Sequence, residues 1–418
     1  MEVEEALRRL SARGAQAEVI HARAFTVDYS WEKGSQHGMT YSEEGYGLRV
    51  VVGGRQGFAY GPRLDEDLLS RALRAAEASE EDKFNAIPGP EGPVEPLPES
   101  FDPSLEEPYD AVRGMLDVVL SQSSGRFNLT MARAWGGWAE VRIVNTEGVD
   151  VSARNSFAGV SASGNYVGGD YVGPEIYEYQ DSRSLRGIRP EAVVERLAGK
   201  VEMTRQRRRA ERLAGRPVLL TPKAVNMLLF PLLNHAASLE NVYRGRSPLR
   251  PGQDLGRKVT VADDPRVPGG VWSRAFDGEG LPARRTVVID GGVFRTALSN
   301  TYWARRAGAP NTHSSWRTFM TLPAISATYL VFDVQPAGDA GDAVVVDEVQ
   351  GVHTSSFDTG EFSVSVSVAW DSEGGLREFV LSGSLTQLLQ GLEGGVGPAE
   401  RHGRVVTPAL LVTGLRMA

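Results

Sequence analysis

Residues 217–243 read PVLLTPKAVNMLLFPLLNHAASLENVY, a short apolar run followed by a stretch that is apolar on nearly every side of a helix. Thr221 followed by Pro222 is a favourable helix start, because threonine caps free amides and proline suits the first helical position. A helix that is apolar all round is normally buried, and Pro231 should kink or split it. We therefore expect a buried helix over residues 221–243.

The sequence after this helix consists mainly of strand and turn signals. Residues 362–370, FSVSVSVAW, alternate between large apolar residues and serine, as expected for a strand with one buried face. Residues 287–294, VVIDGGVF, indicate a hairpin with its turn at Asp290-Gly291-Gly292. Leucines from Leu385 to Leu392 predict one late helix. The second half is thus expected to be a β-rich domain that contains one buried helix.

The first half mixes helix and strand signals. Residues 48–60, LRVVVGGRQGFAY, predict a hairpin that turns at Gly53-Gly54. Apolar periodicity predicts helices over residues 65–79, 112–120 and 190–214. The proline-rich residues 87–108 indicate a long extended loop. With a boundary near Gly215, we expect an α+β protein of two domains: residues 1–215, with helices on an antiparallel-rich sheet, and the β-rich residues 216–418.

Composition excludes several classes of protein. The 418 residues contain no cysteine, which excludes disulfide scaffolds, thiolate metal sites and cysteine nucleophiles. The formal net charge of −8 gives no support to general nucleic-acid binding. No apolar run reaches the length of a membrane span, and the charged N-terminus MEVEEALRRLSARG is unlike a signal peptide. A cytoplasmic protein without membrane contact is the expectation.

Familiar catalytic motifs are missing from the sequence. It has no P-loop, no GxSxG nucleophile elbow and no HExxH zinc motif. The histidines stand at positions 21, 37, 235, 313, 353 and 402, and none lies within four residues of another. A metal site would therefore need ligands from distant segments. We assign neither catalytic nor metal-binding residues.

Several polar residues nevertheless have two interpretations. His235 on the buried helix is either a general base or a hydrogen-bonded core histidine. The carboxylates at 263–264, 277 and 279 serve either acid–base or hard-cation chemistry, or form polar turns. Arg246-Ser247 is either a grip for a carboxylate or a surface turn. The run of arginines over residues 205–209 is either a contact for an acidic partner or a solvated helix face.

Four segments resemble the TldD/PmbA family. They are GRSPLRPGQDLGRKVTVADDP (245–265), AFDGEGLPARRTVVIDGGVFRTALSNTYWARRAG (275–308), TGEFSVSVSVAW (359–370) and, in the first half, EEGYGLRVVVGGRQGFAY (43–60). The turn NTEG at 145–148 is also similar. The resemblance implies the PmbA/TldD-like fold. It also implies one of two branches, because TldD-like members carry a helical His-Glu-x-x-x-His motif and a downstream cysteine for a metal, and PmbA (TldE)-like members lack the motif.

No alignment recovers that motif here. In one register its three metal-site positions fall on Leu232, Leu233 and Ala237, and in another on Phe230, Pro231 and His235. The family's late cysteine corresponds to His402. The segment VGPAERHG (396–403) also lacks the acidic residue usual after Val-Gly, so that position is not carried over. The chain therefore resembles the PmbA/TldE-like branch.

This resemblance implies a non-catalytic subunit of a cytoplasmic metallopeptidase complex. The partner would be a TldD-like catalytic subunit carrying zinc, and the substrates extended or unfolded peptides, which could add to a sheet edge. An alternative is a partner-independent homodimer with a regulatory role, such as a modulator of DNA gyrase. A third hypothesis is a self-sufficient hydrolase built from His235, His402 and Asp264 or Glu279. The residues expected near a substrate- or partner-facing cleft are His235, Glu240, Arg246, Ser247, Asp264, Asp277 and Glu279.

Overall fold

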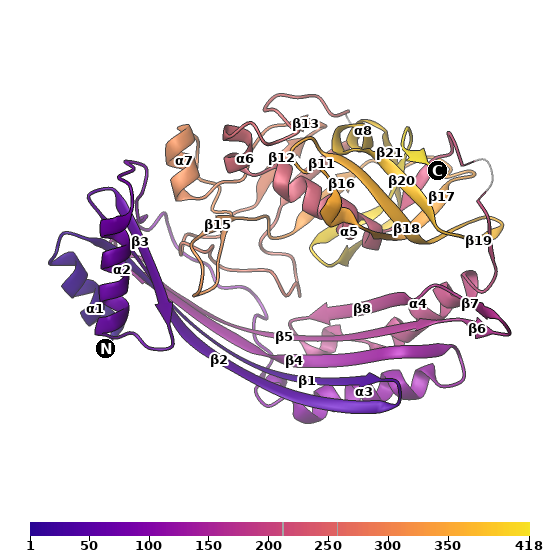
Figure 1. The fold of residues 1–418 in the computed structure, drawn as a ribbon, viewed down its shortest axis with the longest axis horizontal. Coiled ribbons are helices and arrows are strands. Elements are labelled where there is room, and N and C mark those ends of the chain that lie inside the picture. The colour runs from indigo at the N-terminus through magenta and orange to yellow at the C-terminus, as the bar shows by residue number, and fades with distance from the viewer. Residues whose placement is uncertain (211–212, 257) are drawn as a thin grey trace.

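Two β-sheets organise the chain, and the computed structural model describes residues 1–210, 213–256 and 258–418. A long, curved sheet from the first half lies along one side, and a second sheet from the other half packs above it (Figure 1). Helices accompany both sheets, so the expected α+β architecture is confirmed.

The first sheet has six strands in the order β3-β2-β1-β4-β5-β8, and all neighbours are antiparallel. Its strands are β1 (Gln16–Glu32), β2 (Ser35–Val52), β3 (Arg55–Gly61), β4 (Asn128–Asn145), β5 (Asp150–Asn165) and β8 (Ile176–Ser182). Gly53 and Gly54 form the turn between β2 and β3 with φ angles of +56° and +76°, which glycine adopts without strain. The predicted hairpin is therefore confirmed.

Four helices pack on this sheet: α1 (Val3–Ser11), α2 (Glu66–Ala78), α3 (Tyr109–Ser123) and α4 (Pro190–Met203). The carboxylate of Asp65 accepts a hydrogen bond from Leu68 N at 3.0 Å and so caps α2. Helices α1 and α2 enclose a small apolar core at one end of the sheet, while α3 and α4 enclose another farther along it. Between α2 and α3, the proline-rich segment forms only the short 3-10 turn Pro103–Leu105.

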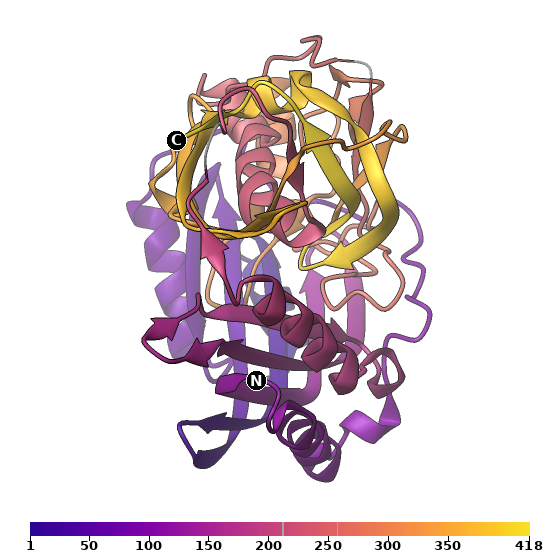
Figure 2. The same cartoon turned by 90° about the vertical axis from the view of Figure 1, so that its right-hand side faces the viewer.

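The second sheet has 13 strands and curls around helix α5 (Pro222–Ala236), as the end-on view shows (Figure 2). Its main path is β13-β12-β11-β16-β22-β10-β17-β18-β19-β9, with β20, β21 and β23 attached to it. Their bounds are β9 Arg207–Arg208, β10 Val218–Leu220, β11 Val259–Asp263, β12 Thr286–Asp290, β13 Val293–Phe294, β16 Leu330–Val334, β17 Val344–Gln350, β18 Glu361–Asp371, β19 Gly374–Leu376, β20 Phe379–Ser384, β21 Leu392–His402, β22 Val405–Val412 and β23 Arg416–Met417.

Shorter elements complete the chain. They are the hairpins β6 (Val167–Gly168) with β7 (Tyr171–Val172) and β14 (Ser315–Trp316) with β15 (Ala324–Ile325), the helices α6 (Leu239–Tyr243), α7 (Thr301–Ala307) and α8 (Leu385–Gln390), and the 3-10 turns Leu185–Gly187 and Val352–Thr354. The expected alternating strand is found as β18, and the expected late helix as α8.

Helix α5 is buried as expected, but it does not split at Pro231. The hydroxyl of Thr221 caps the helix by accepting from Ala224 N at 3.3 Å, and the helix continues through Pro231 to Ala236. The helical hydrogen bonding is interrupted at Ser238, because Leu239 N donates to the carbonyl of the distant Leu298 at 2.8 Å. Tertiary pairing therefore ends the helix.

The helix predicted over residues 190–214 is too long. Helix α4 ends at Met203, and Arg207 and Arg208 form the two-residue strand β9, which pairs in parallel with β19. The arginine run therefore does not lie on a helix face. Residues 211 and 212 of the predicted helix lie outside the described residues.

Candidate functional site

Three of the expected cleft residues hold the corner that follows α5. His235 Nε2 lies 3.0 Å from the Arg246 carbonyl oxygen and 3.1 Å from Asp358 Oδ1. Ser247 Oγ donates to the Ala236 carbonyl at 2.7 Å. These contacts join the end of the helix to the chain that returns past it, so they serve the local fold.

Two other expected residues have ordinary local partners. Glu240 on α6 pairs with Arg244, the residue directly after that helix, at 3.0 Å. Asp264 Oδ1 accepts from Arg266 N at 2.9 Å in a turn, and its Oδ2 lies 3.5 Å from Arg285 Nε. The structure therefore supports the polar-turn interpretation of Asp264.

The helix positions aligned with the family's metal motif do not fit a metal. In one register they are Leu232, Leu233 and Ala237, which are all buried in the core around α5. In the other register only His235 could act as a ligand. Within residues 1–210, 213–256 and 258–418, no group of three or more His, Asp and Glu side chains is arranged to hold a metal ion.

Glu279 belongs to a buried ionic network between the two sheets. Arg49 on β2 donates to Glu18 on β1 at 3.1 and 3.3 Å, and to Glu279 at 3.4 Å through two nitrogens. Arg317 Nη1 lies 2.7 Å from Glu18 Oε1, without hydrogen-bond geometry. Glu279 also accepts from Thr301 N at 2.8 Å. This network fastens two loops of the second half to the first sheet.

Asp277 lies beside this network and organises its own loop. Its Oδ1 accepts hydrogen bonds from Glu279 N and Leu281 N at 2.9 and 3.0 Å. Burial is the main cause that raises the pKa of Asp277, and the negative charge of Glu279 raises it further. Burial also raises the pKa of the nearby Asp263 to about 6, although Thr328 N donates to it. The junction thus holds two carboxyl groups whose ionised forms are disfavoured by burial.

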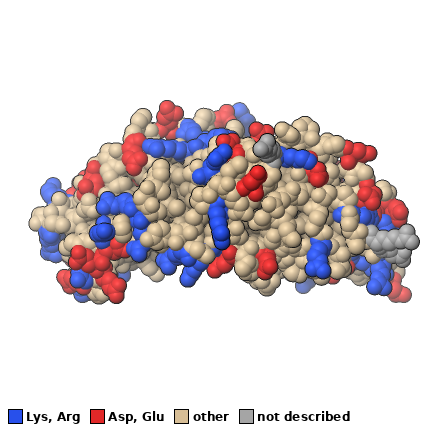
Figure 3. All heavy atoms as spheres, turned by 90° about the horizontal axis from the view of Figure 1, so that it is seen from above, with Lys and Arg blue, Asp and Glu red and all other residues tan. Residues whose placement is uncertain are grey.

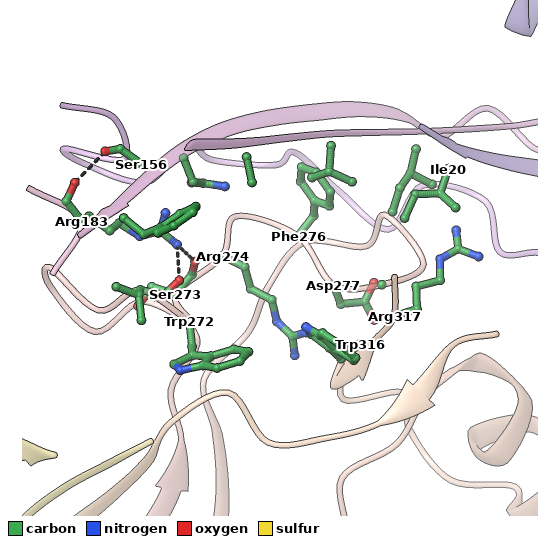
Figure 4. Close-up of a pocket in the computed structure, with 17 residues that line it drawn as sticks. Ile20, Ser156, Arg183, Trp272, Ser273, Arg274, Phe276, Asp277, Trp316 and Arg317 are labelled. Carbon is green, nitrogen blue, oxygen red and sulfur yellow. Dashed lines mark hydrogen bonds between the residues drawn. The ribbon is translucent and has the colours of Figure 1, made fainter. Parts of the chain in front are cut away.

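A cavity of about 230 Å³ lies between the first sheet and these loops. Strand residues of β1, β4 and β5 provide a largely apolar wall, among them Ile20, Val141 and Ile143. Trp272, Arg274 and Trp316 lie on the opposite side (Figure 4). Of the seven residues expected in a cleft, Asp277 alone is among those that line it. The expected residues are therefore not gathered into one cleft.

Arginines give this cavity its charge. Arg183 donates to the carbonyls of Gly270 at 2.9 Å, Val271 at 3.1 Å and Ser273, and burial lowers its pKa to about 10. Arg274 donates to the Ser315 carbonyl at 2.5 Å. No carboxylate of the described chain lies within ion-pair distance of either guanidinium. Each is held by backbone oxygens, which leaves its positive charge without a direct counter-ion.

His402 lines a separate cavity of about 470 Å³ at the start of α5. Its ring packs edge-on against Tyr179 with centroids 4.7 Å apart, and burial lowers its pKa to about 4. Burial alone would raise the pKa of the neighbouring Glu178, but Lys223 and Lys200 lower it to about 2. This cluster joins β8 and α4 to the second sheet by charge pairing.

His402 and His235 lie near opposite ends of α5. Arg404 N, two residues after His402, donates to Asn226 Oδ1 at 2.9 Å. Asn226 precedes His235 by nine residues, which corresponds to about 14 Å along a helix. That separation excludes direct proton transfer between the two imidazoles, so the structure does not support a self-sufficient hydrolase built from them.

No motif in the sequence singles out Arg183, Trp272, Arg274 or Trp316. They occur in segments without a periodic pattern or a known motif. One signal was present, since Trp272 and Arg274 lie between the two acidic turns at 263–264 and 277–279. Trp272 and Arg274 line one cavity with residues of β5 and with Trp316 only because segments far apart in the chain come into contact in the fold.

Comparison with known proteins agrees with this arrangement. The pattern described as PmbA/TldA metallopeptidase C-terminal domain matches residues 215–418, and PmbA/TldA metallopeptidase domain 1 matches residues 17–80. An uncharacterized protein of Methanocaldococcus jannaschii is 24% identical over 99% of both chains. Metalloprotease PmbA of Escherichia coli O157:H7 is 23% identical over 92% of this chain and 88% of its own.

Solved structures share the whole fold. TldE from Thermococcus kodakarensis superposes with a TM-score of 0.90 at 21% identity, over 99% of each chain. A protein of Thermotoga maritima titled a putative modulator of a DNA gyrase superposes with a TM-score of 0.89 at 19% identity, also over 99% of each chain. The fold and the altered helix together define a metallopeptidase-type scaffold without the helical metal motif. The chain belongs to the PmbA/TldD family, in its PmbA (TldE)-like branch.

Proposed function

We propose that this chain is the non-catalytic subunit of a cytoplasmic peptidase complex, in which a TldD-like partner carries zinc and cleaves extended or unfolded peptides. One observation carries the proposal. In one register the positions aligned with the metal motif are filled by Leu232, Leu233 and Ala237, whose side chains form part of the core around α5. In the other register only His235 could act as a ligand. Restoring ligands there would put polar groups into that core, at a cost to the fold.

The surface beside the cavity supports a role in peptide contact. Trp272, Trp316, Met320 and Leu322 are large apolar side chains that remain exposed. Three of them fall within residues 316–322, in strand β14 and in the loop that joins it to β15. We infer that these side chains contribute to a contact site, because contiguous exposed apolar patches mark sites where peptides or proteins bind. They would offer an unfolded peptide a surface without demanding a particular sequence.

The charge distribution on one face is consistent with a protein or peptide partner. On the face seen from above, acidic and basic side chains are interspersed, without one large basic patch (Figure 3). No helix in the described part of the chain is long and apolar enough to cross a bilayer. This surface offers no electrostatic footprint for DNA.

Reconstitution with the TldD-like protein encoded in the same genome tests the proposal. The two chains are expected to co-elute as one complex at micromolar concentration. The partner, with zinc, is expected to hydrolyse an unfolded peptide faster in the presence of this chain. This chain alone is expected to be inactive with or without zinc. Separate elution of the two proteins would refute the subunit role.

The same experiment separates the alternative, a partner-independent regulator. That function predicts a homodimer whose elution is unchanged by the TldD-like protein. A DNA-binding assay at several salt concentrations tests the DNA-binding version, because phosphate contacts make affinity fall steeply with salt.

A further inference from the structure

We propose that the cavity between the first sheet and the loops of residues 271–278 and 316–317 binds the C-terminal residue of a peptide, with the free carboxylate at Arg274 and Arg183 and an apolar side chain against the strands. This assignment rests on the proposed function only because it takes a peptide as the source of the carboxylate. The site itself is defined by side chains of this chain.

Two arginines that line the cavity retain unused hydrogen-bond donors. Arg274 Nε is buried without a hydrogen-bond partner, and so are Nε and Nη2 of Arg317. Both side chains line the cavity. A buried guanidinium with free donors costs stability unless an acceptor reaches it, and a carboxylate is the acceptor that its geometry matches best.

The buried charges around the cavity also favour a carboxylate ligand. Arg317 and Arg49 are balanced by Glu18 and Glu279 within the ionic network. The remaining buried charges of this region are three cations and two carboxyl groups: Arg183, Arg274 and Arg404 on one side, and Asp263 and Asp277 on the other. One additional negative charge would make the group neutral. A single carboxylate supplies that charge, whereas a phosphate dianion exceeds it.

Arg404 contributes to this excess of buried positive charge. It is held by the carbonyls of Thr328 and Ala327 and lies over the rings of Phe230 and Trp272, at 4.6 and 4.9 Å from their centroids. No carboxylate in the described residues pairs directly with it. Burial lowers its pKa to about 10, the direction expected for a cation short of anionic partners.

The volume and the lining of the cavity suit a single apolar residue. Its strand wall presents Ile20, Val141 and Ile143. A volume of about 230 Å³ accommodates one residue with an aliphatic side chain, but not a folded segment. Trp272 and Trp316 line the cavity and are exposed, so they can contact the residues that precede the C-terminus. The apolar wall and the cationic wall together favour a peptide whose C-terminal residue has an aliphatic side chain such as that of leucine.

Isothermal titration of the purified chain at pH 7.5 tests this site with three probes. They are acetyl-Ala-Ala-Leu with a free carboxylate, the same peptide as its C-terminal amide, and 4-methylpentanoate as a small free acid. The free peptide is expected to bind at least tenfold more tightly than the amide or the small acid. Equal affinity for peptide acid and amide, or no detectable binding of either, would overturn the proposal. Equal binding of 4-methylpentanoate would reassign the site to a free acid and overturn the peptide assignment.

Variants locate the binding in the cavity. Arg274→Gln is expected to abolish the tenfold preference for the acid. Trp316→Ala, at an exposed position that does not threaten folding, is expected to weaken both peptides by a similar factor. Arg295→Gln is the matched control, because Arg295 is exposed and does not line the cavity. Unchanged binding by Arg274→Gln and Trp316→Ala would refute this location. Because these titrations need no partner, their outcome is independent of whether the subunit complex forms.

Discussion

Replacing Arg49 by methionine should strongly destabilise the protein, because Arg49 is the centre of the buried network between the two sheets. Its guanidinium makes two hydrogen bonds to Glu18 and two to Glu279, and all three side chains are almost completely inaccessible. Burial alone would lower the pKa of Arg49, but Glu18 and Glu279 raise it, so the guanidinium stays charged. The substitution leaves two buried carboxylates facing Arg317 alone.

The expected cost follows from that arrangement. Removing one partner of a buried ion pair typically costs about 3–5 kcal/mol, mainly because the remaining charge is left without compensation. We therefore expect Arg49→Met to lower the free energy of unfolding by about 3–5 kcal/mol. Adding Glu279→Gln removes one uncompensated charge, so the double variant should recover at least about 1 kcal/mol of this loss.

Urea denaturation followed by circular dichroism measures the effect. Arg142→Met is the matched control, since Arg142 lies on the same sheet and pairs with Asp150 and Glu4 at the exposed surface. Its loss should cost no more than about 1 kcal/mol. If Arg49→Met and Arg142→Met unfold at the same urea concentration, the network does not fasten the sheets as described.

Three further predictions test other parts of the fold. His402 has a pKa of about 4 in the folded protein and 6.5 in the unfolded chain, so the folded state binds fewer protons between these pH values and loses up to about 3 kcal/mol of stability as the pH falls through them. His402→Gln should abolish this share of the loss when the urea midpoints at pH 7.5 and 4.5 are compared. An unchanged pH dependence would contradict this. Ser247→Ala removes the bond to the Ala236 carbonyl and the acceptor for Leu249 N, and should cost about 1–2 kcal/mol in the same assay; no shift would mean that this corner is held by other contacts. Gly280 has a φ of +78°, and a Cβ added there would lie 2.6 Å from Val149, whereas a Cβ added at Gly291, with a φ of +50°, meets nothing within 4 Å. Gly280→Ala should therefore destabilise the protein by more than the roughly 1–2 kcal/mol of a left-handed backbone, and Gly291→Ala should not. Equal losses of stability would refute the close packing of this turn on the first sheet.

Elements with a clear local pattern could be predicted from the sequence. The alternation in residues 362–370 predicts β18, and the apolar stretch after Thr221 predicts a core helix. Pro231 does not split the helix, because the packing of α5 inside the curled sheet outweighs the one helical hydrogen bond that a proline removes. Helix α4 also ends earlier than its pattern suggests, where Arg207 and Arg208 pair with a strand more than 160 residues away.

The candidate site was less predictable. The acidic turn at 277–279 could be identified, yet its role as an attachment to Arg49 depends on a contact across 230 residues. Likewise, Arg183 and Arg274 have no motif around them, and only the folded chain brings both to one cavity. His235 was a natural candidate because histidine often serves catalysis, but its ring is used to hold the corner after α5.

Peptide hydrolysis tests most directly whether this chain is a non-catalytic subunit that acts through a TldD-like partner. Initial rates are measured with zinc and one unfolded peptide for this chain alone, the partner alone and an equimolar mixture. We expect no hydrolysis by this chain alone and a higher rate for the mixture than for the partner alone. Zinc-dependent hydrolysis by this chain alone, or a mixture no faster than the partner, would contradict it.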